Sequence, residues 1–216
     1  MGDFFTADSF SVVNISGGTV GDGFDSVRFS VVNISGGTVG DTFDALTGSV
    51  VNISGGTVGI GFDAFASEIN ISGGTIGDTF DAFPDSVINL FGSEFFIDGV
   101  ELDTLLLGET FTITDRDVTL SGLLADGEQF SFDLNSINSF GIPDFFSPES
   151  TLTVTLTTNP LLRGDVNFDG VVDFFDIAPF IGVLSNSAFQ LEADIDVSGA
   201  VDFFDIAPFI QLLSGQ

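Results

Sequence analysis

The chain has 216 residues and a formal net charge of -29 at pH 7, because 32 Asp and Glu face three Arg and no Lys. It contains no Cys and no His, which excludes disulfides, Cys-ligated metal centres and catalysis by thiolate or imidazole. Such an acidic surface repels phosphate backbones and anionic lipid headgroups, and we therefore expect no nucleic-acid partner. Divalent cations bound by oxygen ligands are the expected counter-charge. The sequence has no run of 18 apolar residues, so we expect no membrane insertion.

The first 92 residues repeat a unit of about 19 residues. Four close copies of VVNISGGTVGD and a degenerate fifth, VINLFGSEF, begin at Val12, Val31, Val50, Glu68 and Val87. A unit this short, rich in Val, Ile and Gly, cannot hold two helices and suits one coil of a β-solenoid, in which strands of successive coils lie about 4.8 Å apart. Residues 1–92 are therefore predicted to form a parallel β-solenoid.

Comparison of the copies separates the two faces of the repeated strand. The first position is Val12 in one copy and Glu68 in another, which predicts that it faces water. The second and fourth positions stay aliphatic in the four close copies, which predicts that they point into the core. The Gly pair is predicted to turn the corner, since positive φ costs glycine little. The Phe residues predicted to fill another wall belong to the pairs Phe24-Asp25, Phe43-Asp44, Phe62-Asp63 and Phe80-Asp81.

Two polar positions also recur in the copies. The Asn of NISGG is predicted to form a ladder of side-chain amides along the stack. The Thr that follows the Gly pair is predicted to form a second ladder, or alternatively a flat face that binds ice or carbohydrate. The repeat contains one basic residue, Arg28, and its acids recur coil by coil without converging, so the chain is predicted not to be an enzyme.

Residues 93–160 lose the period but keep strand signals. A hairpin with a type I′ turn is predicted at Asp98-Gly99, and strands are predicted on both sides of a turn at Asp126-Gly127. Residues 150–158 alternate as a further strand. We expect this segment to be a β-rich cap or continuation of the solenoid, followed by a linker, because the open end of a solenoid needs cover. Within it, Asp115–Asp117 is predicted to be a solvated turn with a local ion pair.

Residues 161–216 contain a tandem duplication, with DVNFDGVVDFFDIAPFI beginning at Asp165 and DIDVSGAVDFFDIAPFI at Asp194. Side-chain oxygens fall at loop positions 1, 3, 5, 9 and 12, with Gly at 6, which is the spacing of an EF-hand calcium loop. Calcium takes about six to eight oxygen ligands, and position 7 supplies a backbone carbonyl. The predicted ligands of two Ca²⁺ ions are Asp165, Asn167, Asp169, Val171, Asp173 and Asp176, and Asp194, Asp196, Ser198, Ala200, Asp202 and Asp205.

The duplicated loop–helix pattern resembles the type I dockerin modules over about residues 164–213. In both loops position 12 is Asp, and a single helix is expected to follow. The resemblance implies calcium-dependent binding to a cohesin-like protein, and a cell-envelope component is the other partner we expect. The repeat joined to such a module is similar to secreted proteins of planctomycete-type bacteria, which implies an extracellular or cell-surface location, although residues 1–10 have no signal-peptide pattern.

Loop positions 10 and 11 are Phe-Phe in both copies. The resemblance implies that these positions contact the partner, although twin Phe departs from the smaller polar or mixed residues of that family. A module of this size has little core, so the same side chains also suit core packing. Both interpretations stay open for Phe174, Phe175, Phe203 and Phe204.

A Pro lies three residues after each position 12 and suits the first turn of a helix. Helices are therefore predicted to begin at Ile177 and Ile206, with Asp176 and Asp205 near their N-caps. An apolar seam between the helices is predicted from Phe180, Ile181, Leu184, Phe209, Ile210 and Leu213.

These patterns predict a mainly β protein with a short β-solenoid, a β cap and a small calcium-binding loop–helix pair. The leading hypothesis is a secreted or cell-surface, non-catalytic structural or binding protein that docks through its C-terminal module. The alternative is a fragment of a carbohydrate-active, polysaccharide-degrading β-helix protein with the same module. Carbohydrate on the solenoid face is a further expected ligand, and an ice- or surface-binding protein is the third hypothesis.

Overall fold

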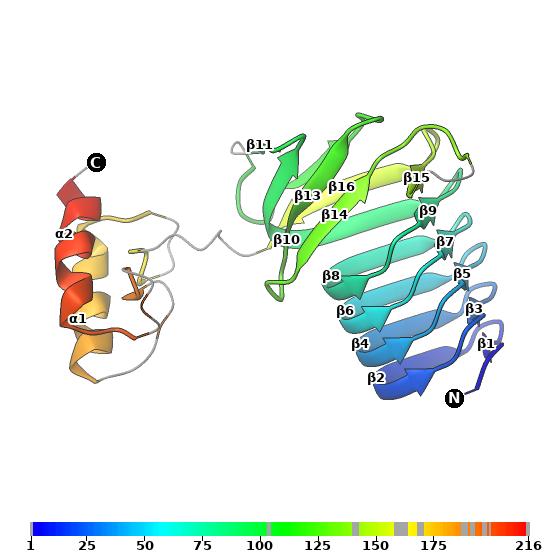
Figure 1. The fold of residues 1–216 in the computed structure, drawn as a ribbon, viewed down its shortest axis with the longest axis horizontal. Helices are drawn as coiled ribbons and strands as arrows, with labels where there is room; N and C mark the ends of the chain where they lie inside the picture. Colours follow the sequence, from blue (N-terminus) through cyan, green and yellow to red (C-terminus); the bar gives the residue numbers. More distant parts are fainter. Residues whose placement is uncertain are drawn as a thin grey trace. The chain divides into compact units, whose positions relative to one another are not determined.

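The computed structural model describes residues 2–102, 105–139, 143–157, 164–167, 171–186, 190, 193–195, 198 and 200–214. The chain divides into two compact units, Met1–Thr158, which is built of strands, and Asn159–Gln216, which holds both α-helices (Figure 1). Among the described residues, no helix has the length and apolar character needed to cross a membrane.

Each coil of the first unit contributes one long and one short strand to two parallel sheets (Figure 1). The long strands are β2 (Val12–Val20), β4 (Val31–Val39), β6 (Val50–Val58), β8 (Glu68–Ile76) and β10 (Val87–Ile97). The short strands are β1 (Thr6–Ala7), β3 (Asp25–Ser26), β5 (Phe43–Ala45), β7 (Phe62–Ala64) and β9 (Phe80–Ala82). Equivalent residues of adjacent coils pair in register. The predicted β-solenoid is therefore confirmed.

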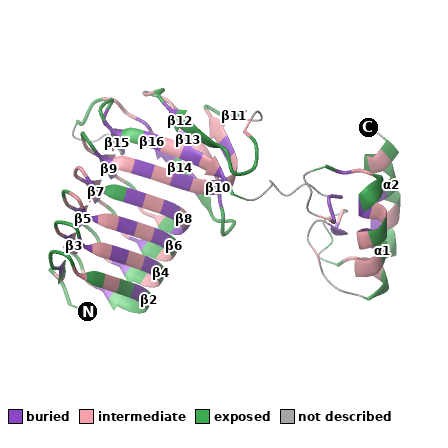
Figure 2. Cartoon of the chain, turned by 180° about the vertical axis from the view of Figure 1, so that it is seen from behind, coloured by how far each residue is buried: buried purple, intermediate pink, exposed green. Residues whose placement is uncertain are grey.

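The core of the solenoid is a column of stacked Phe rings opposite aliphatic side chains. Phe24, Phe43, Phe62 and Phe80 are fully buried, and their neighbouring ring centroids lie 4.7, 4.7 and 4.9 Å apart. Buried and partly exposed positions alternate along the long strands, as predicted for their second and fourth residues (Figure 2). Because every coil repeats these contacts, the hydrophobic core is continuous along the stack.

The Gly pairs bend the long strands without ending them. The second Gly of each pair has positive φ, as at Gly37 (84°) and Gly56 (87°), and the pairing register shifts there. A Cβ on Gly37 would lie 2.7 Å from the carbonyl oxygen of Gly18 in the coil below. The corner therefore requires glycine both for its conformation and for the close approach of the coils.

The Asn column forms the predicted amide ladder. The Nδ2 of Asn33 donates to the Oδ1 of Asn14 at 2.8 Å, and the same bond recurs on the next coils up to Asn89 at 2.8–2.9 Å. The ladder ends where Thr153 Oγ1 donates to Asn89 Oδ1 at 2.8 Å. The Thr column, exemplified by Thr38 and Thr57, is exposed and paired in register.

The middle segment leaves the stack and then returns to it. Strand β16 (Thr151–Leu156) pairs in parallel with β10, and β15 (Phe145–Phe146) pairs in parallel with β9. Residues 145–156 therefore add another solenoid coil. Strand β12 (Thr110–Ile113) then runs antiparallel along β16 and covers the exposed edge of the larger sheet, as a short edge strand can.

The inserted residues form the predicted hairpins. Strand β10 turns through Asp98 and Gly99, both with positive φ, into β11 (Val100–Glu101), which confirms the two-residue turn. Strands β13 (Thr119–Leu124) and β14 (Gln129–Asp133) form the second hairpin, and β13 pairs with the end of β10.

The prediction that Asp115–Asp117 forms only a solvated turn is wrong for Arg116. Its half-buried guanidinium donates to the carbonyl oxygens of Phe146 (3.0 Å), Ser147 (3.1 Å) and Ser150 (3.2 Å). Arg116 therefore fixes the returning coil. It also donates to the nearby carbonyls of Ile113 and Asp115, but no local pattern indicates its bonds to the returning coil.

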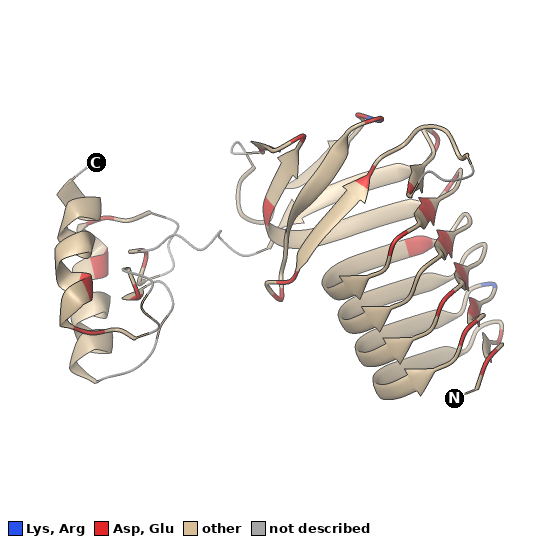
Figure 3. Cartoon of the chain, viewed as in Figure 1, with Lys and Arg blue, Asp and Glu red and all other residues tan. Residues whose placement is uncertain are grey.

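A row of carboxylates follows the outer side of the short strands (Figure 3). Asp25, Asp44, Asp63 and Asp81 pair in register on successive coils. Burial, followed by the charges of Asp81 and Asp44, raises the pKa of Asp63 from 3.8 to about 7. A carboxyl whose pKa is higher in the folded than in the unfolded protein reduces the free energy of unfolding as the pH rises. The loss begins at the unfolded-state pKa and is complete above the folded-state pKa.

We therefore expect Asp63→Asn to stabilise the solenoid at pH 8 but hardly at pH 4. Because Asp63 is partly exposed and screened by solvent, the gain is about 1–2 kcal/mol. Thermal unfolding followed by circular dichroism at both pH values measures this, with Asp8→Asn at an exposed position as the control. An equal effect of Asp63→Asn at pH 4 and pH 8 would contradict the assignment.

Candidate calcium and docking site

Two equivalent loop–helix segments form the described part of the second unit. Each contains a short 3-10 turn, η1 (Phe174–Asp176) or η3 (Phe203–Asp205), that leads directly into a helix. The helices are α1 (Ile177–Ser185) and α2 (Ile206–Ser214). Both begin at the predicted residue, and a Pro lies in the first turn of each.

Asp176 is the N-cap residue of α1, as predicted, but the side-chain cap bonds come from other residues. Asp173 caps the 3-10 turn by accepting a hydrogen bond from the backbone N–H of Phe175 at 2.7 Å, and Asp202 does the same for Phe204 at 2.8 Å. Asp176 makes no side-chain cap bond to α1. The side-chain cap therefore lies one turn earlier than expected, because a 3-10 turn precedes the helix.

The position-12 carboxylates close the two loops. Asp176 Oδ2 accepts from the backbone N–H of Asp173 at 2.8 Å, and its Oδ1 accepts from that of Asn167 at 3.0 Å. Asp205 repeats this arrangement with Asp202 at 2.8 Å and Ile195 at 2.7 Å. Each carboxylate thus joins the beginning and the end of its loop.

Four carboxylates of these loops are buried. Asp176 and Asp205 have no exposed surface, and Asp165 and Asp194 are 3% and 2% exposed. The unit's one basic residue, Arg163, lies outside the described residues. Removing ionised carboxylates from water is costly unless a positive charge compensates. The backbone N–H donors compensate in part, and a bound cation would complete the compensation.

The structure places some of the predicted calcium ligands together. Asn167 and Asp173 both meet Asp176 through backbone N–H groups, and Ser198 donates its backbone N–H to Asp194 Oδ1 at 2.9 Å. Val171 and Ala200 are exposed. The predicted ligands Asp169 and Asp196 and the loop glycines Gly170 and Gly199 lie outside the described residues. Among the residues described, no three acidic side chains are grouped as a metal site.

The four Phe of loop positions 10 and 11 are exposed, so the core-packing interpretation is wrong. Phe174, Phe175, Phe203 and Phe204 are 77, 72, 76 and 72% exposed. Their backbone lies in the 3-10 turns, which point these side chains away from the small core. Phe180 and Phe209 fill that core instead, with ring centroids 4.2 Å apart.

The seam between α1 and α2 is apolar but partly open. A cavity of about 420 Å³ is lined only by apolar residues of the two helices. Phe180 and Phe209 are buried at its base, whereas Ile181 and Ile210 are 54 and 57% exposed. All six residues predicted for the apolar seam line this cavity, so the seam is confirmed, and the exposed Ile181 and Ile210 leave it partly open.

Comparison of the chain with protein-family models, with curated proteins and with solved structures finds no match.

Proposed function

We propose that residues 161–216 form a module that binds two Ca²⁺ ions and docks the chain to a partner protein. The observation that carries this proposal is the burial of four loop carboxylates in one small unit, Asp165, Asp176, Asp194 and Asp205. Their spacing matches that of calcium-loop ligands in both copies.

The donor set suits calcium and no softer metal. All predicted side-chain ligands are carboxylate, amide or hydroxyl oxygens, and the chain has no Cys or His. In the first loop Asp165, Asn167, Asp169, Val171, Asp173 and Asp176 would hold the ion, and in the second Asp194, Asp196, Ser198, Ala200, Asp202 and Asp205. Bound calcium would compensate the buried charges and stabilise the loops that precede both helices.

The docking surface would be the exposed Phe pairs. The rings within each pair are T-shaped, with centroids 6.4 Å apart in one loop and 6.3 Å in the other. Exposed aromatic clusters are typical of interfaces, where aromatic anchors supply most of the binding energy. A cohesin-like protein or a cell-envelope component is the proposed partner, and the proposed role is structural, non-catalytic and at the cell surface or outside the cell.

A native-gel binding assay with a panel of purified type I cohesin modules tests the docking proposal. We expect a shifted complex in calcium that is lost in EDTA and weakened at least about tenfold by Phe174→Ser combined with Phe203→Ser, because interface aromatics are worth about 2 kcal/mol or more. Phe4→Ser, at an exposed position of the first unit, is the control. A complex that persists in EDTA, or no complex with any cohesin, would contradict docking of this type.

A further inference from the structure

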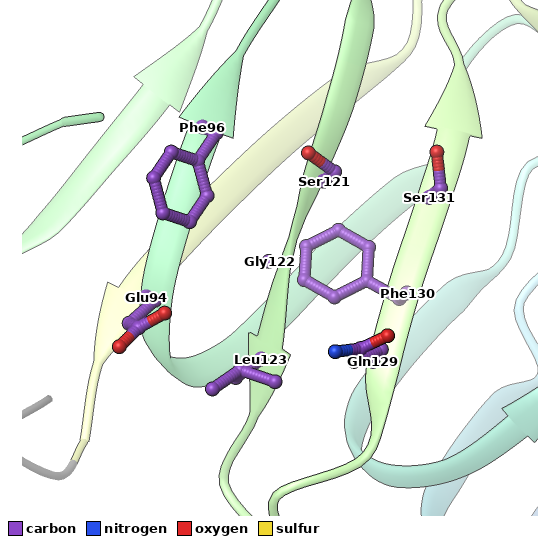
Figure 4. Close-up of a pocket in the computed structure, with 8 residues that line it drawn as sticks. All are labelled: Glu94, Phe96, Ser121, Gly122, Leu123, Gln129, Phe130 and Ser131. Carbon is purple, nitrogen blue, oxygen red and sulfur yellow. The ribbon is translucent and has the colours of Figure 1, made fainter. Parts of the chain in front are cut away.

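The insertion in the first unit carries a hollow on the outer face of a three-stranded sheet (Figure 4). The end of β10, strand β13 and strand β14 form this sheet. The hollow has a volume of about 470 Å³, within the range of small-ligand sites. The side chains directed to this face form two rows across the strands, Glu94, Leu123 and Gln129, and Phe96, Ser121 and Ser131.

The middle row between them faces the core and leaves the hollow open. It consists of Phe95, Gly122 and Phe130, and both Phe are buried. A Cβ on Gly122 would overlap the carbonyl oxygen of Glu94 and lie 3.0 Å from Cε1 of Phe130. Glycine therefore allows β13 to approach β10 closely at this point of the sheet.

The polar side chains of the hollow are available to a ligand. The side chains of Glu94, Ser121, Gln129 and Ser131 make no hydrogen bond to any residue that the structure describes. They combine a carboxylate, an amide and two hydroxyls around a partly exposed aromatic ring, Phe96. Elsewhere in the same insertion polar side chains are paired, as Asp133 is with Thr119 at 2.9 Å.

We propose that this hollow binds a neutral oligosaccharide. A pyranose presents an apolar C–H face, which suits the ring of Phe96, and an edge of hydroxyls, which suits carboxylate, amide and hydroxyl partners. The charge of Glu94 and the net charge of -29 disfavour uronic acids and sulfated or phosphorylated glycans. Glu94 is the one carboxylate among the described residues that line the hollow, whereas glycoside hydrolysis uses a pair, so the proposed role is binding.

Affinity electrophoresis of the full chain tests this proposal with three probes in the gel: a soluble β-glucan, a galactomannan and, as the anionic comparison, alginate. We expect at least one neutral polysaccharide to retard migration, equally with calcium and with EDTA, because the hollow lies outside the calcium module. Phe96→Ala and Gln129→Ala should each raise the apparent Kd by about tenfold. Phe111→Ala, 47% exposed on β12, is the matched aromatic control and should leave it unchanged.

Circular dichroism shows whether each variant keeps the β fold. Gln129 is exposed, so its variant decides the matter if Phe96→Ala perturbs the sheet. Retardation by neither neutral polysaccharide, retardation by alginate alone, or retardation that both variants leave unchanged would overturn the proposal. Since the expected retardation does not depend on calcium, failure of this test leaves the proposed docking module unaffected. Failure of the docking module likewise leaves this site unaffected.

Discussion

Phe62→Ala is expected to destabilise the solenoid by about 3–5 kcal/mol, the usual cost of truncating a buried Phe. Phe62 is fully buried and stacks on Phe43 at 4.7 Å and on Phe80 at 4.9 Å. The neighbouring rings are held by backbone pairing on both sides, so the cavity cannot collapse easily. A domain's whole stability is about 5–15 kcal/mol, so the β signal in circular dichroism should melt about 10 °C lower or be lost.

Phe4→Ala is the matched control, because Phe4 is 84% exposed in the same unit. It should change the free energy of unfolding by no more than about 0.5 kcal/mol. If both variants had the melting temperature of the wild type, the continuous Phe column would not be what holds the coils together.

Neutralising the position-12 carboxylates is expected to have the second large effect. Asp176→Asn or Asp205→Asn should weaken calcium binding to the altered loop at least about tenfold, because a charged oxygen ligand is lost. Each side chain also accepts two backbone hydrogen bonds, so some stability is lost without calcium as well. The decisive quantity is therefore the rise in melting temperature that calcium produces.

That rise should shrink in either variant and vanish in the double variant. Asp8→Asn, at an exposed position of the solenoid, should leave it unchanged. A variant that melts lower by the same amount in calcium and in EDTA would show that Asp176 and Asp205 only close the loops.

The sequence predicts the solenoid well because its copies are nearly identical, so facing positions such as Asn33 and Asn52 can be compared directly. The returning coil at β15 and β16 was predicted only in part, as a strand at residues 150–158, because its copy has diverged. One local signal remains: Pro148-Glu149-Ser150 repeats Pro84-Asp85-Ser86, and both segments precede a long strand. Alignment on that short motif would have placed the coil.

The sequence predicts the spacing of the loop residues in the candidate docking site, but it does not predict that the Phe side chains are exposed. Loop periodicity places Phe174 and Phe203 after position 9 but cannot say whether a 3-10 turn directs them inward or outward. The hollow beside Gly122 had no sequence signal either. It depends on the pairing of β13 with the end of β10, where the register shifts between Gly92 and Glu94.

Calorimetric titration of the full chain with calcium, with circular dichroism before and after EDTA, tests the central claim most directly. We predict two binding sites and a reversible gain of helix, both abolished when Asp176→Asn and Asp205→Asn are combined. No binding, binding without a gain of helix, or binding that the double variant leaves unchanged would contradict a calcium-dependent C-terminal module.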